Sequence, residues 1–384
     1  MDLTRREEQL LNGAEGNVIS SAYRILAAVG EATSASKLVP IQWAHISGVN
    51  YNTIGEAGRK FLEDFCLDAK VQVTTTINPM GFDRDKPSSI PEEFFNKQMS
   101  IVNSYRSIGV MDSFTCTPYE VYHLPEAGSF VSLAETNAAV FANSMLGLLT
   151  NKESALSALA GAITGKAPLS ELRINELRAP KQTIKPSLEM DTELSYGLLG
   201  YFAGKEIKAS SVGINGIKIK SIEEAKALSA GIGSMGDLGM FILNSKTKGE
   251  AISFGKNEAT SIKDELNSAE TGDIILFGSP QLGIPELKLL AKNAEGKKFT
   301  KPCLIFCAKR IHDYARSIGL LDRLERTGAK LMCDCCICLT PLVTKQNADS
   351  VVTNSVKGAY YMKNANKLNV ALRDSKSITK EYMT

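Results

Sequence analysis

The 384-residue chain carries very little net charge, because 44 Lys and Arg residues stand against 42 Asp and Glu residues. It has no block of like charges and no basic run with interleaved aromatic residues, which argues against nucleic acid as a partner. No apolar run approaches the roughly 18 residues that a membrane span needs. The first residues are polar, unlike a signal peptide. We therefore expect a cytoplasmic protein without nucleic-acid or membrane partners.

Apolar residues make up 43% of the chain and charged residues 22%, which is typical of a globular protein with two or three packed units. From about residue 221 short apolar strands alternate with helical segments, the rhythm of a parallel sheet. A stretch rich in Pro, Lys and Glu at residues 178–193 is a candidate boundary. We expect one catalytic domain over residues 1–384, subdivided near 180–220, with 221–384 a βαβ-type unit.

Helices are predicted from periodicity and from N-terminal signals. Residues 17–32 and 90–109 have apolar positions at helical spacing, whereas 71–79 resembles a strand. Two serines stand three residues before a glutamate, the spacing of a capping box. The pairs are Ser132 with Glu135 and Ser221 with Glu224. Each pair is expected to begin a helix.

The segment GIGSMG matches the glycine pattern of a dinucleotide site at Gly231, Gly233 and Gly236. That site requires a strand before the glycines and a helix after them. Here a capped helix comes first and the strand-like LGMFIL follows. We interpret the segment as a glycine-rich turn from helix to strand and reject a nicotinamide site.

Ligands of open α/β sheets bind beyond the carboxyl ends of the strands, which selects a short set of polar residues and thiols. We expect this set to gather on one edge: Gly278, Ser279, Cys307, Asp334, Cys335, Cys336, Asn354, Ser355 and Lys357, with Asn78 and Cys116 from further upstream. A histidine on the loop AHISGVNYNTIGEAG, His45, is a second candidate, because polar loops with glycines approach ligands.

The segment MCDCCICLTP places four of the eight cysteines within six positions. A zinc site would need a second pair of ligands, and thiols on a strand alternate faces, so four cannot bind one ion. Cys333 and Cys338 are interpreted as buried apolar side chains. Cys335 or Cys336, at the strand tip, is the better ligand. An iron–sulfur cluster can take ligands from distant loops, and Cys116 would supply one.

Several segments, in order along nearly the whole chain, resemble the aconitase X family. They are LTRREEQLLNGAEG, AHISGVNYNTIGEAG, TTTINPMGFD, CTPY, ETNAAVFANSMLG, TNKE, INELR and VVTNSVKGAYYM. In DCCICLTP, Cys336 matches the family cysteine. The resemblance implies an α/β fold with mixed or parallel sheets and covering helices, in two or three subdomains around one active-site cleft.

The resemblance also implies a hydro-lyase that uses a [4Fe-4S] cluster, or iron held by cysteines, as a Lewis acid. Family members of about this length are large subunits that act with a separate small subunit. Their substrate is (R)-5-phosphomevalonate, dehydrated to trans-anhydromevalonate 5-phosphate in the archaeal mevalonate pathway to isoprenoids. Longer relatives, with a small domain fused on, dehydrate cis-3-hydroxy-L-proline. Because the sequence ends without that domain, we expect the two-subunit form.

The implied residues fall into three groups. Cys116 and Cys336 are expected to bind the metal, with Cys307 as a third ligand by the strand-tip argument. His45, Ser47 and Lys357 are the expected catalytic residues. The expected substrate contacts are Gly48, Asn78, Asn137, Asn143 and Ser355. The base of aconitase-like enzymes is often a serine of the small domain, so we do not assign it in this chain.

Two departures from the family pattern favour an alternative. Gly278-Ser279-Pro280-Gln281 stands where the family has Gly-Cys-Pro-His or Gly-Thr-Pro-His, and SKTKGEA lacks a family histidine. These changes would suit a paralogue with reduced activity that serves as a metal-binding scaffold. Another hydro-lyase acting on a small hydroxy acid is the second alternative.

Overall fold

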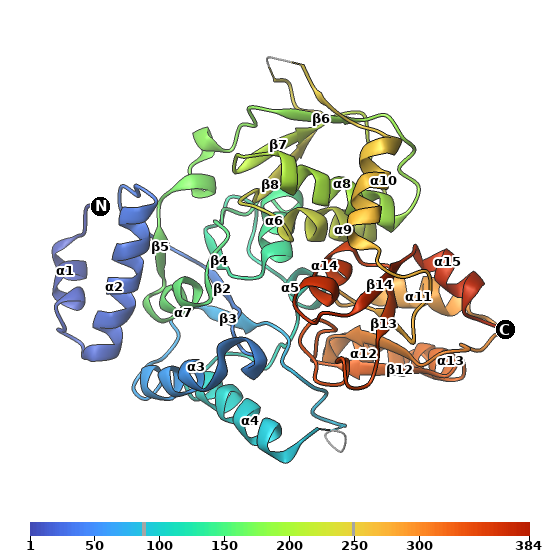
Figure 1. Cartoon of the computed structure of the whole chain (residues 1–384). Coiled ribbons are helices and arrows are strands. Elements are labelled where there is room, and N and C mark those ends of the chain that lie inside the picture. Colours follow the sequence, from blue (N-terminus) through green and yellow to red (C-terminus); the bar gives the residue numbers. More distant parts are fainter. Residues whose placement is uncertain (87–89, 248–249) are drawn as a thin grey trace. The chain divides into compact units, whose positions relative to one another are not determined.

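Parallel β-sheets covered by helices make up the fold (Figure 1). The computed structural model describes residues 1–86, 90–247 and 250–384, so part of the predicted SKTKGEA departure lies outside the described residues. The predicted α/β class is confirmed. Two compact units are present: unit 1 comprises Met1–Asn78, Pro91–Ala179 and Gly239–Phe241, and unit 2 comprises Pro79–Ile90, Pro180–Leu238 and Ile242–Thr384.

Unit 1 holds a parallel sheet of order β3-β2-β4 and an antiparallel pair, β1 with β5. Its elements are α1 (Arg5–Leu11), α2 (Asn17–Ala32), β1 (Leu38–Pro40), β2 (Trp43–Ile46), α3 (Tyr51–Phe65), β3 (Thr74–Ile77), α4 (Glu92–Ser107), α5 (Pro118–Val121), β4 (Val131–Leu133), α6 (Thr136–Met145), α7 (Ala155–Thr164), β5 (Lys166–Pro168) and the 3-10 turns η2 (Glu171–Arg173) and η3 (Asn175–Leu177).

Helix α2 matches the predicted helix over residues 17–32. Its buried residues Ala22, Tyr23, Leu26 and Gly30 recur at intervals of three and four, so one face of the helix is apolar. That helix packs against α7, which in turn packs on β2. The predicted strand at 71–79 is β3, and the predicted helix at 90–109 is α4.

One of the two predicted capping boxes is wrong. Ser132 lies inside strand β4, where it pairs with Ala44 of β2, and helix α6 begins only at Thr136. The N-cap of α6 is Glu135, whose side chain accepts from the amide of Asn137. The apolar residues that follow Ser132 were needed to complete the sheet, so the helix starts later than the spacing predicted.

Unit 2 holds a four-stranded sheet of order β8-β7-β6-β9 and a five-stranded parallel sheet of order β12-β11-β10-β13-β14. Its elements are β6 (Thr183–Pro186), α8 (Glu193–Glu206), β7 (Ser211–Ile214), α9 (Ile222–Gly233), β8 (Met240–Leu243), β9 (Ile252–Phe254), α10 (Lys256–Leu266), β10 (Ile274–Phe277), α11 (Ile284–Asn293), β11 (Cys303–Cys307), α12 (Lys309–Ser317), α13 (Leu320–Glu325), β12 (Ala329–Cys333), β13 (Ser350–Thr353), α14 (Val356–Asn364), β14 (Asn369–Leu372) and α15 (Ser375–Glu381).

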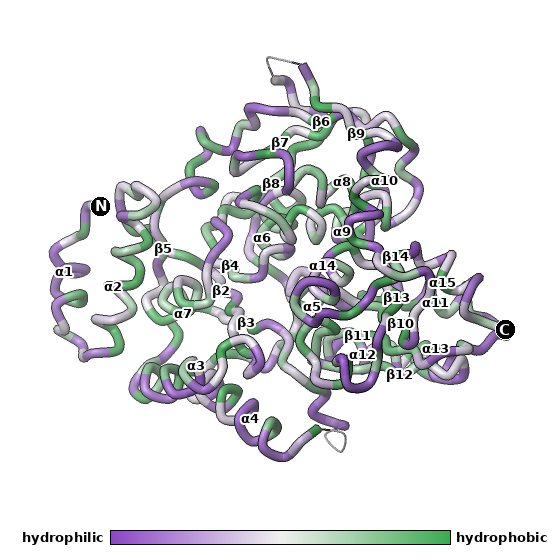
Figure 2. The backbone as a smooth tube through the Cα atoms, in the orientation of Figure 1, coloured by the Kyte–Doolittle hydropathy of each residue, from purple (hydrophilic) through white to green (hydrophobic). Residues whose placement is uncertain are grey.

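The alternation predicted from about residue 221 is divided between these two sheets. Strands β8 and β9 belong with β6 and β7, and the five-stranded sheet starts only at β10. The strands of the five-stranded sheet are short apolar runs, drawn mostly in green in Figure 2. Helices cover this parallel sheet, so both faces of its strands are buried. The sequence of each strand is therefore mainly apolar rather than alternating.

Helices α8 and α9 approach so closely that their backbones touch. A Cβ atom built on Gly200 would lie 2.3 Å from the carbonyl oxygen of Leu228, and one on Gly231 would lie 2.3 Å from that of Gly197. The glycines of GIGSMG therefore end α9 and allow this contact. Helix α9 precedes them and β8 follows, so the predicted order of helix, glycine-rich turn and strand is confirmed. The predicted cap is also confirmed, since Ser221 accepts from the amide of Glu224.

Candidate active site

The five strands are parallel, but the direction in which the chain adds strands to the sheet reverses after β12. The chain runs outward from β10 to β11 and β12, and then returns to add β13 and β14 on the other side of β10. The carboxyl ends of β10 and β13 therefore flank a topological switch point, the usual position of a ligand in such sheets. The polar residues predicted at strand ends in residues 278–357 lie along this edge.

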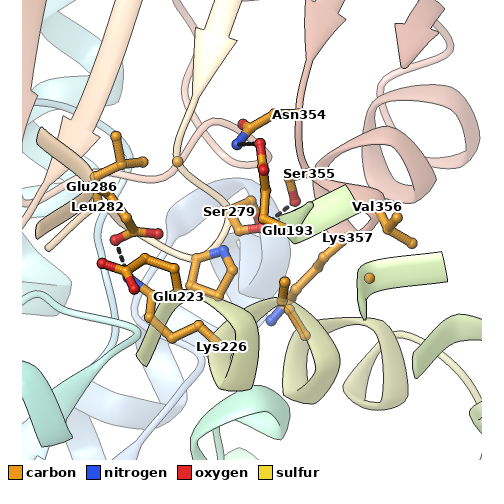
Figure 3. Close-up of a pocket in the computed structure, with 15 residues that line it drawn as sticks. Glu193, Glu223, Lys226, Ser279, Leu282, Glu286, Asn354, Ser355, Val356 and Lys357 are labelled. Atoms are coloured by element: carbon orange, nitrogen blue, oxygen red, sulfur yellow. Dashed lines mark hydrogen bonds and ion pairs between the residues drawn. The ribbon is translucent and has the colours of Figure 1, made fainter. Parts of the chain in front are cut away.

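A pocket occupies the switch point (Figure 3). Its walls come from the loop after β10, from the first turn of α14 after β13, and from helices α8 and α9. Its charged and polar lining residues are Glu193, Glu223, Lys226, Ser279, Glu286, Asn354, Ser355 and Lys357. Four of these, Ser279, Asn354, Ser355 and Lys357, were predicted from the sequence to lie at this edge, and Ser279 is also the position where a cysteine or threonine is common.

Ser355 joins the two loops of the switch point. It is the N-cap of α14, and its hydroxyl accepts from the amide of Gly358 at 2.8 Å. The same hydroxyl donates to the carbonyl oxygen of Ser279, in the loop after β10. Lys357 follows within the first helical turn, with only 8% of its surface exposed. The side chain of Ser355 thus holds the first turn of α14, which carries Lys357, against the loop after β10.

A buried ion pair that the sequence analysis did not identify forms one wall of the pocket. Nζ of Lys226 lies 2.5 Å from Oε2 of Glu286 and donates to the carbonyl oxygen of Gln281 at 2.8 Å. Glu286 also accepts from the amide of Gly283 at 2.6 Å. Gln281 is fully buried, and its Nε2 donates to the carbonyl oxygen of Cys335 at 3.2 Å. The pair therefore holds the β10 loop, and Gln281 connects that loop to the cysteine segment.

The cysteine segment continues from β12 as a tight turn. The carbonyl oxygen of Cys336 accepts from the amides of Leu339 and Thr340, both at 3.1 Å. The thiols of Cys336 and Cys338 share a hydrogen bond, and this bond, together with burial, raises the pKa of Cys336 well above its usual range, against the charge of Lys357. Sγ of Cys338 also lies 3.6 Å from Oγ of Ser279.

Cys307 has a different set of neighbours. It is fully buried at the end of β11 and is the register partner of Cys333 on β12. The hydrogen bond from Cys307 and then burial raise the pKa of Cys333, and the contact with Cys333 raises the pKa of His312. His312, in α12, is buried. The structure therefore groups Cys307 with Cys333 and His312, and Cys336 with Cys338.

A strap formed by residues 79–86 fixes the end of β12. The carboxylate of Asp83 accepts from the amide of Cys333 at 3.0 Å, and Arg84 forms an ion pair of 3.0 Å with Asp334. Burial raises the pKa of Asp334 to about 6, although Arg84 acts in the opposite direction. Asp334 has a positive φ of 61°, and Met80 donates to its carbonyl oxygen at 2.9 Å.

In unit 1, His45 lies within a directed chain of hydrogen bonds. Asn78 uses its amide nitrogen to donate to Glu135 at 2.8 Å, so its oxygen faces Nε2 of His45, also at 2.8 Å. Nε2 must therefore carry the proton, and Nδ1 accepts from Thr76 at 2.8 Å. Trp43 donates to the same hydroxyl at 3.0 Å. Complete burial lowers the pKa of His45, opposed by Asn78 and Glu135, so the ring is neutral.

The chain of hydrogen bonds extends from Glu135 to the loop of Cys116. Asn137, fully buried in α6, donates to Glu135 at 2.7 Å and to the carbonyl oxygen of Cys116 at 3.2 Å. Its own oxygen accepts from the hydroxyl of Tyr119 at 3.1 Å. Asn137 therefore fixes the backbone that carries Cys116. His45 and Thr76 are register partners on β2 and β3, so the prediction that His45 lies on a loop is wrong, whereas Asn78 and Glu135 follow β3 and β4.

The prediction that Asn78 and Cys116 lie on the same sheet edge as the other residues is wrong. Asn78 follows β3, in a sheet separate from β10–β14, and Cys116 lies in the irregular segment between α4 and α5. Strand-end position alone does not reveal which sheet a strand joins. Ser47 and Gly48 lie just after β2, and Gly48 has a positive φ of 75°.

Asn143 has its amide group occupied by contacts within unit 1. Its nitrogen donates to the carbonyl oxygens of Thr150 and Gly239, at 2.9 and 3.1 Å. Its oxygen accepts from the amide of Thr150 and from Arg178, both at 3.1 Å. Because Asn143 is also almost fully buried, these contacts support a structural role, and its assignment to substrate stays a prediction.

The described residues contain only partial sets of metal-binding side chains. Within the described ranges, no three His, Cys, Asp or Glu side chains converge as ligands of one ion. Two partial donor sets are present: the thiols of Cys336 and Cys338 with the hydroxyl of Ser279, and the thiols of Cys307 and Cys333 with the ring of His312. Two thiols and a hydroxyl suit a thiophilic ion such as iron. As to membranes, the described part of the chain contains no helix that is both long and apolar enough to cross one.

Comparison with known proteins places the chain in a family. It belongs to the aconitase X family, since sequence models of the family's first, second and third domains match residues 1–176, 180–271 and 272–384. The predicted resemblance is thereby confirmed.

Relatives and a solved structure agree with this assignment. The phosphomevalonate dehydratase large subunit of Methanocaldococcus jannaschii is 34% identical over 99% of this chain and 100% of the relative. The cis-3-hydroxy-L-proline dehydratase of Hypocrea jecorina is 29% identical over 94% of this chain and 65% of the relative. The crystal structure of Thermococcus kodakaraensis aconitase X in its holo-form has a TM-score of 0.92 and 32% identity, with 100% of both chains covered.

Proposed function

We propose that this chain is the large, catalytic subunit of a hydro-lyase that dehydrates (R)-5-phosphomevalonate to trans-anhydromevalonate 5-phosphate. The observation that carries the proposal is the match to the M. jannaschii phosphomevalonate dehydratase large subunit over that protein's full length. A separate small subunit, a cytoplasmic location and a place in the archaeal mevalonate pathway to isoprenoids belong to the same proposal. In this proposal both units, over residues 1–384, together form the large-subunit part of the enzyme.

Three carboxylates and two lysines line the pocket at the switch point, and Lys226 is paired with Glu286, so Lys357 is the group that we assign to an anionic substrate. Lys357 brings a positive charge to the first turn of α14, where helix amides also favour negative charge. We assign Lys357 to the carboxylate or phosphate of the substrate. Ser355, which binds the carbonyl oxygen of Ser279, positions the helix that carries Lys357. Dehydration also requires a base that removes a proton from the substrate, and we assign this base to the small subunit.

Unit 1 contributes positioning groups. The neutral ring of His45 donates to Asn78, and Asn137 binds the backbone of Cys116. In this proposal Ser47, Gly48 and Asn78 contact the substrate, and His45 fixes the orientation of Asn78. The complete burial of His45 argues for this orienting role rather than for direct proton exchange with substrate.

Iron is the proposed cofactor, either held by cysteines or as an iron–sulfur cluster of the [4Fe-4S] type. The donor chemistry of the cysteine turn fits it, and Cys116 and Cys336 are the proposed ligands, with Cys307 as the third predicted one. When bound, iron supplies Lewis acidity that assists departure of the substrate hydroxide. The residues of this chain then hold the substrate charge through Lys357 and fix the loops around it.

The test is reconstitution of the two-subunit enzyme. The chain should be co-produced with its genomic small-subunit partner without oxygen, its iron and sulfide measured, and dehydration of 5-phosphomevalonate followed by mass spectrometry. We expect iron in the complex and a loss of one water from 5-phosphomevalonate. An intact complex without iron and without activity would support the scaffold alternative.

A second substrate must be included in the same assay. The Hypocrea jecorina relative is named for cis-3-hydroxy-L-proline, and it matches 94% of this chain. Turnover of cis-3-hydroxy-L-proline, with none of 5-phosphomevalonate, would identify this second candidate function. Because both assays use the same preparation, iron content is the shared control.

A further inference from the structure

Another cavity of unit 2 lies at the edge of the five-stranded sheet that is opposite to the switch point. Its walls are the turn after α11, at residues 294–298, and the end of α13 with the turn that follows, at residues 323–327. These turns lead into β11 and β12, so the cavity lies beside the amino ends of those strands. Because the strands are parallel, their amino ends lie on the edge opposite to their carboxyl ends. None of the described residues lines both this cavity and the pocket at the switch point.

The charged side chains that line this cavity are mostly cationic. They are four cations and one carboxylate: Lys297, Lys298, Arg323, Arg326 and Glu295. The pocket at the switch point has the opposite balance, with three carboxylates and two lysines. Over the whole chain 44 cationic residues stand against 42 acidic ones, so the excess of cations in this cavity is a local feature. A concave wall that carries one sign of charge concentrates ions of the other sign.

Three of the four cations are not neutralised by neighbouring side chains. In the part of the chain that the structure describes, the side chains of Lys297, Lys298 and Arg326 form no hydrogen bond and no ion pair. Nη2 of Arg323 lies 3.9 Å from Oε1 of Glu295, and both side chains are exposed. Exposed ion pairs of this kind contribute little. The positive charge of the cavity is therefore available to a bound anion.

Backbone hydrogen bonds hold the turns that carry these cations. The amide of Phe299 donates to the carbonyl oxygen of Thr327 at 2.8 Å, which joins the turn after α11 to the turn after α13. The amide of Lys298 donates to the carbonyl oxygen of Thr384 at 2.8 Å, and the amide of Thr384 donates back at 3.0 Å. Helix α11 also packs against α13 (Figure 1). A ligand would therefore meet a fixed backbone and would have only side chains to order.

Two glycines leave open space beside the cations. Gly296 and Gly319 line the cavity, and a Cβ atom on either would have nothing within 4 Å. The cavity has a volume of about 660 Å³. Sites for small molecules typically measure about 300–1,000 Å³. The size of the cavity therefore suits a small molecule.

We propose that this cavity binds a small phosphorylated molecule that carries at least two negative charges. Arg323 and Arg326 supply planar guanidinium groups, which donate paired hydrogen bonds to phosphate oxygens. Lys297 and Lys298 add positive charge without a fixed geometry. The inference goes beyond the proposed function and does not depend on it, because the cavity and the switch-point pocket have no lining residue in common.

Inorganic pyrophosphate is the probe for the test, and isothermal titration calorimetry of the full chain is the measurement. R323M and R326M should each lower the affinity about 10- to 100-fold, the usual loss for a hydrogen bond to a charged group. R326K should recover part of the loss, because it keeps the charge without the planar fork. E295Q should instead raise the affinity roughly twofold, since it removes the one carboxylate.

The matched control is R24M, which removes the same charge from an exposed arginine of α2 in unit 1. Its affinity should stay within about twofold of wild type, because surface charges that are further apart than a Debye length are screened at about 0.15 M salt. Thermal unfolding checks that each variant is folded. An equal loss in R24M and R326M would show that pyrophosphate responds to net charge alone and would overturn the proposal.

Titration of K357M identifies which cavity binds. This variant removes a cation from the switch-point pocket only, so the pyrophosphate at the amino edge should remain bound. Two pyrophosphates per wild-type chain, one lost in R326M and the other in K357M, would also support the proposal. Binding that is lost in K357M but unchanged in R323M and R326M would overturn it, as would the absence of any binding.

Further probes define the class of ligand. ADP represents nucleotides, glycerol 3-phosphate represents small phosphate monoesters, and citrate represents polycarboxylates. Tighter binding of pyrophosphate, ADP or glycerol 3-phosphate than of citrate would support phosphate as the recognised group and would show which source of phosphate fits. Citrate or a polyglutamate peptide that binds at least as tightly as every phosphorylated probe would overturn the proposal. These titrations contain neither substrate nor small subunit, so an inactive two-subunit complex would leave their result unchanged.

Discussion

Nζ of Lys226 lies 2.5 Å from a carboxylate oxygen of Glu286, and only 2% of the lysine side chain is exposed. The two residues come from α9 and α11, and together they hold the loop after β10. Buried ion pairs are weak evidence for stability, yet removing one partner leaves an uncompensated charge. The pair therefore fixes geometry at the pocket wall.

We predict that K226M destabilises the protein by roughly 1–3 kcal/mol, because the carbonyl oxygen of Gln281 and the carboxylate of Glu286 lose a buried donor. Urea unfolding measures the change. The matched control is K205M, since the ion pair of Lys205 with Glu265 has side chains 43% and 40% exposed and should contribute at most about 1 kcal/mol. Equal effects of the two variants would contradict the role given to Lys226.

A second prediction concerns pH and His45. Burial lowers the pKa of His45 from 6.5, so the unfolded chain binds a proton at this side chain before the folded one does. Stability is therefore complete above about pH 6.5 and falls as the pH drops below that value, by at most about 1.4 kcal/mol per pH unit. Thermal unfolding from pH 5 to 8 measures the slope.

The control for this prediction is H45Q, which cannot titrate. Its stability should be lower at neutral pH, because the ring no longer joins Thr76 to Asn78, but it should lack the part of the acid slope that His45 causes. A wild-type slope below pH 6.5 that is unchanged in H45Q would show that other groups cause it.

The sequence predicted local elements well and long-range partners poorly. Helix α2 and the strands from β10 to β14 were recognised because apolar periodicity and buried runs are local properties. The contact between Lys226 and Glu286 joins residues 60 positions apart, and no spacing rule reaches that far. A lysine among the small apolar residues of α9 was the one local signal that could have indicated it.

The cysteine turn shows the same limit at the site. The spacing of the four cysteines was interpreted as a strand, which argued against a four-thiol site, and the separate prediction that Cys338 is buried is confirmed. The chain leaves the strand after Cys333 and forms a local turn, in which the amides of Leu339 and Thr340 donate to the carbonyl oxygen of Cys336. The expected grouping of Ser279, Ser355 and Lys357 succeeded because parallel strands place their carboxyl ends on one edge.

A third prediction concerns Gly278, the residue that leads from β10 into the pocket. Its φ is +123°, and a Cβ atom there would lie 2.8 Å from the carbonyl oxygen of Phe306, a backbone atom that cannot move aside. G278A should therefore cost roughly 2–4 kcal/mol through strain and overlap. The control is G296A, where φ is +72° but nothing lies within 4 Å, with a cost of about 1 kcal/mol. Denaturant unfolding of both variants tests the difference, and similar costs would contradict the overlap argument.

The fourth prediction tests Lys357 as the residue that holds substrate charge. Hydrogen bonds to charged groups contribute about 1.5–3 kcal/mol, so K357M should lower kcat/KM for 5-phosphomevalonate by about 10- to 100-fold. K357R should restore part of the loss, because it keeps the charge. K363M is the matched control, since Lys363 is in the last turn of the same helix and bonds to the carbonyl oxygen of Glu265. The assay uses the two-subunit complex, with thermal unfolding as a check that α14 remains folded. Activity of K357M within twofold of wild type would remove Lys357 from the site, whereas loss in K357M with recovery in K357R would establish that a positive charge is needed at the first turn of α14.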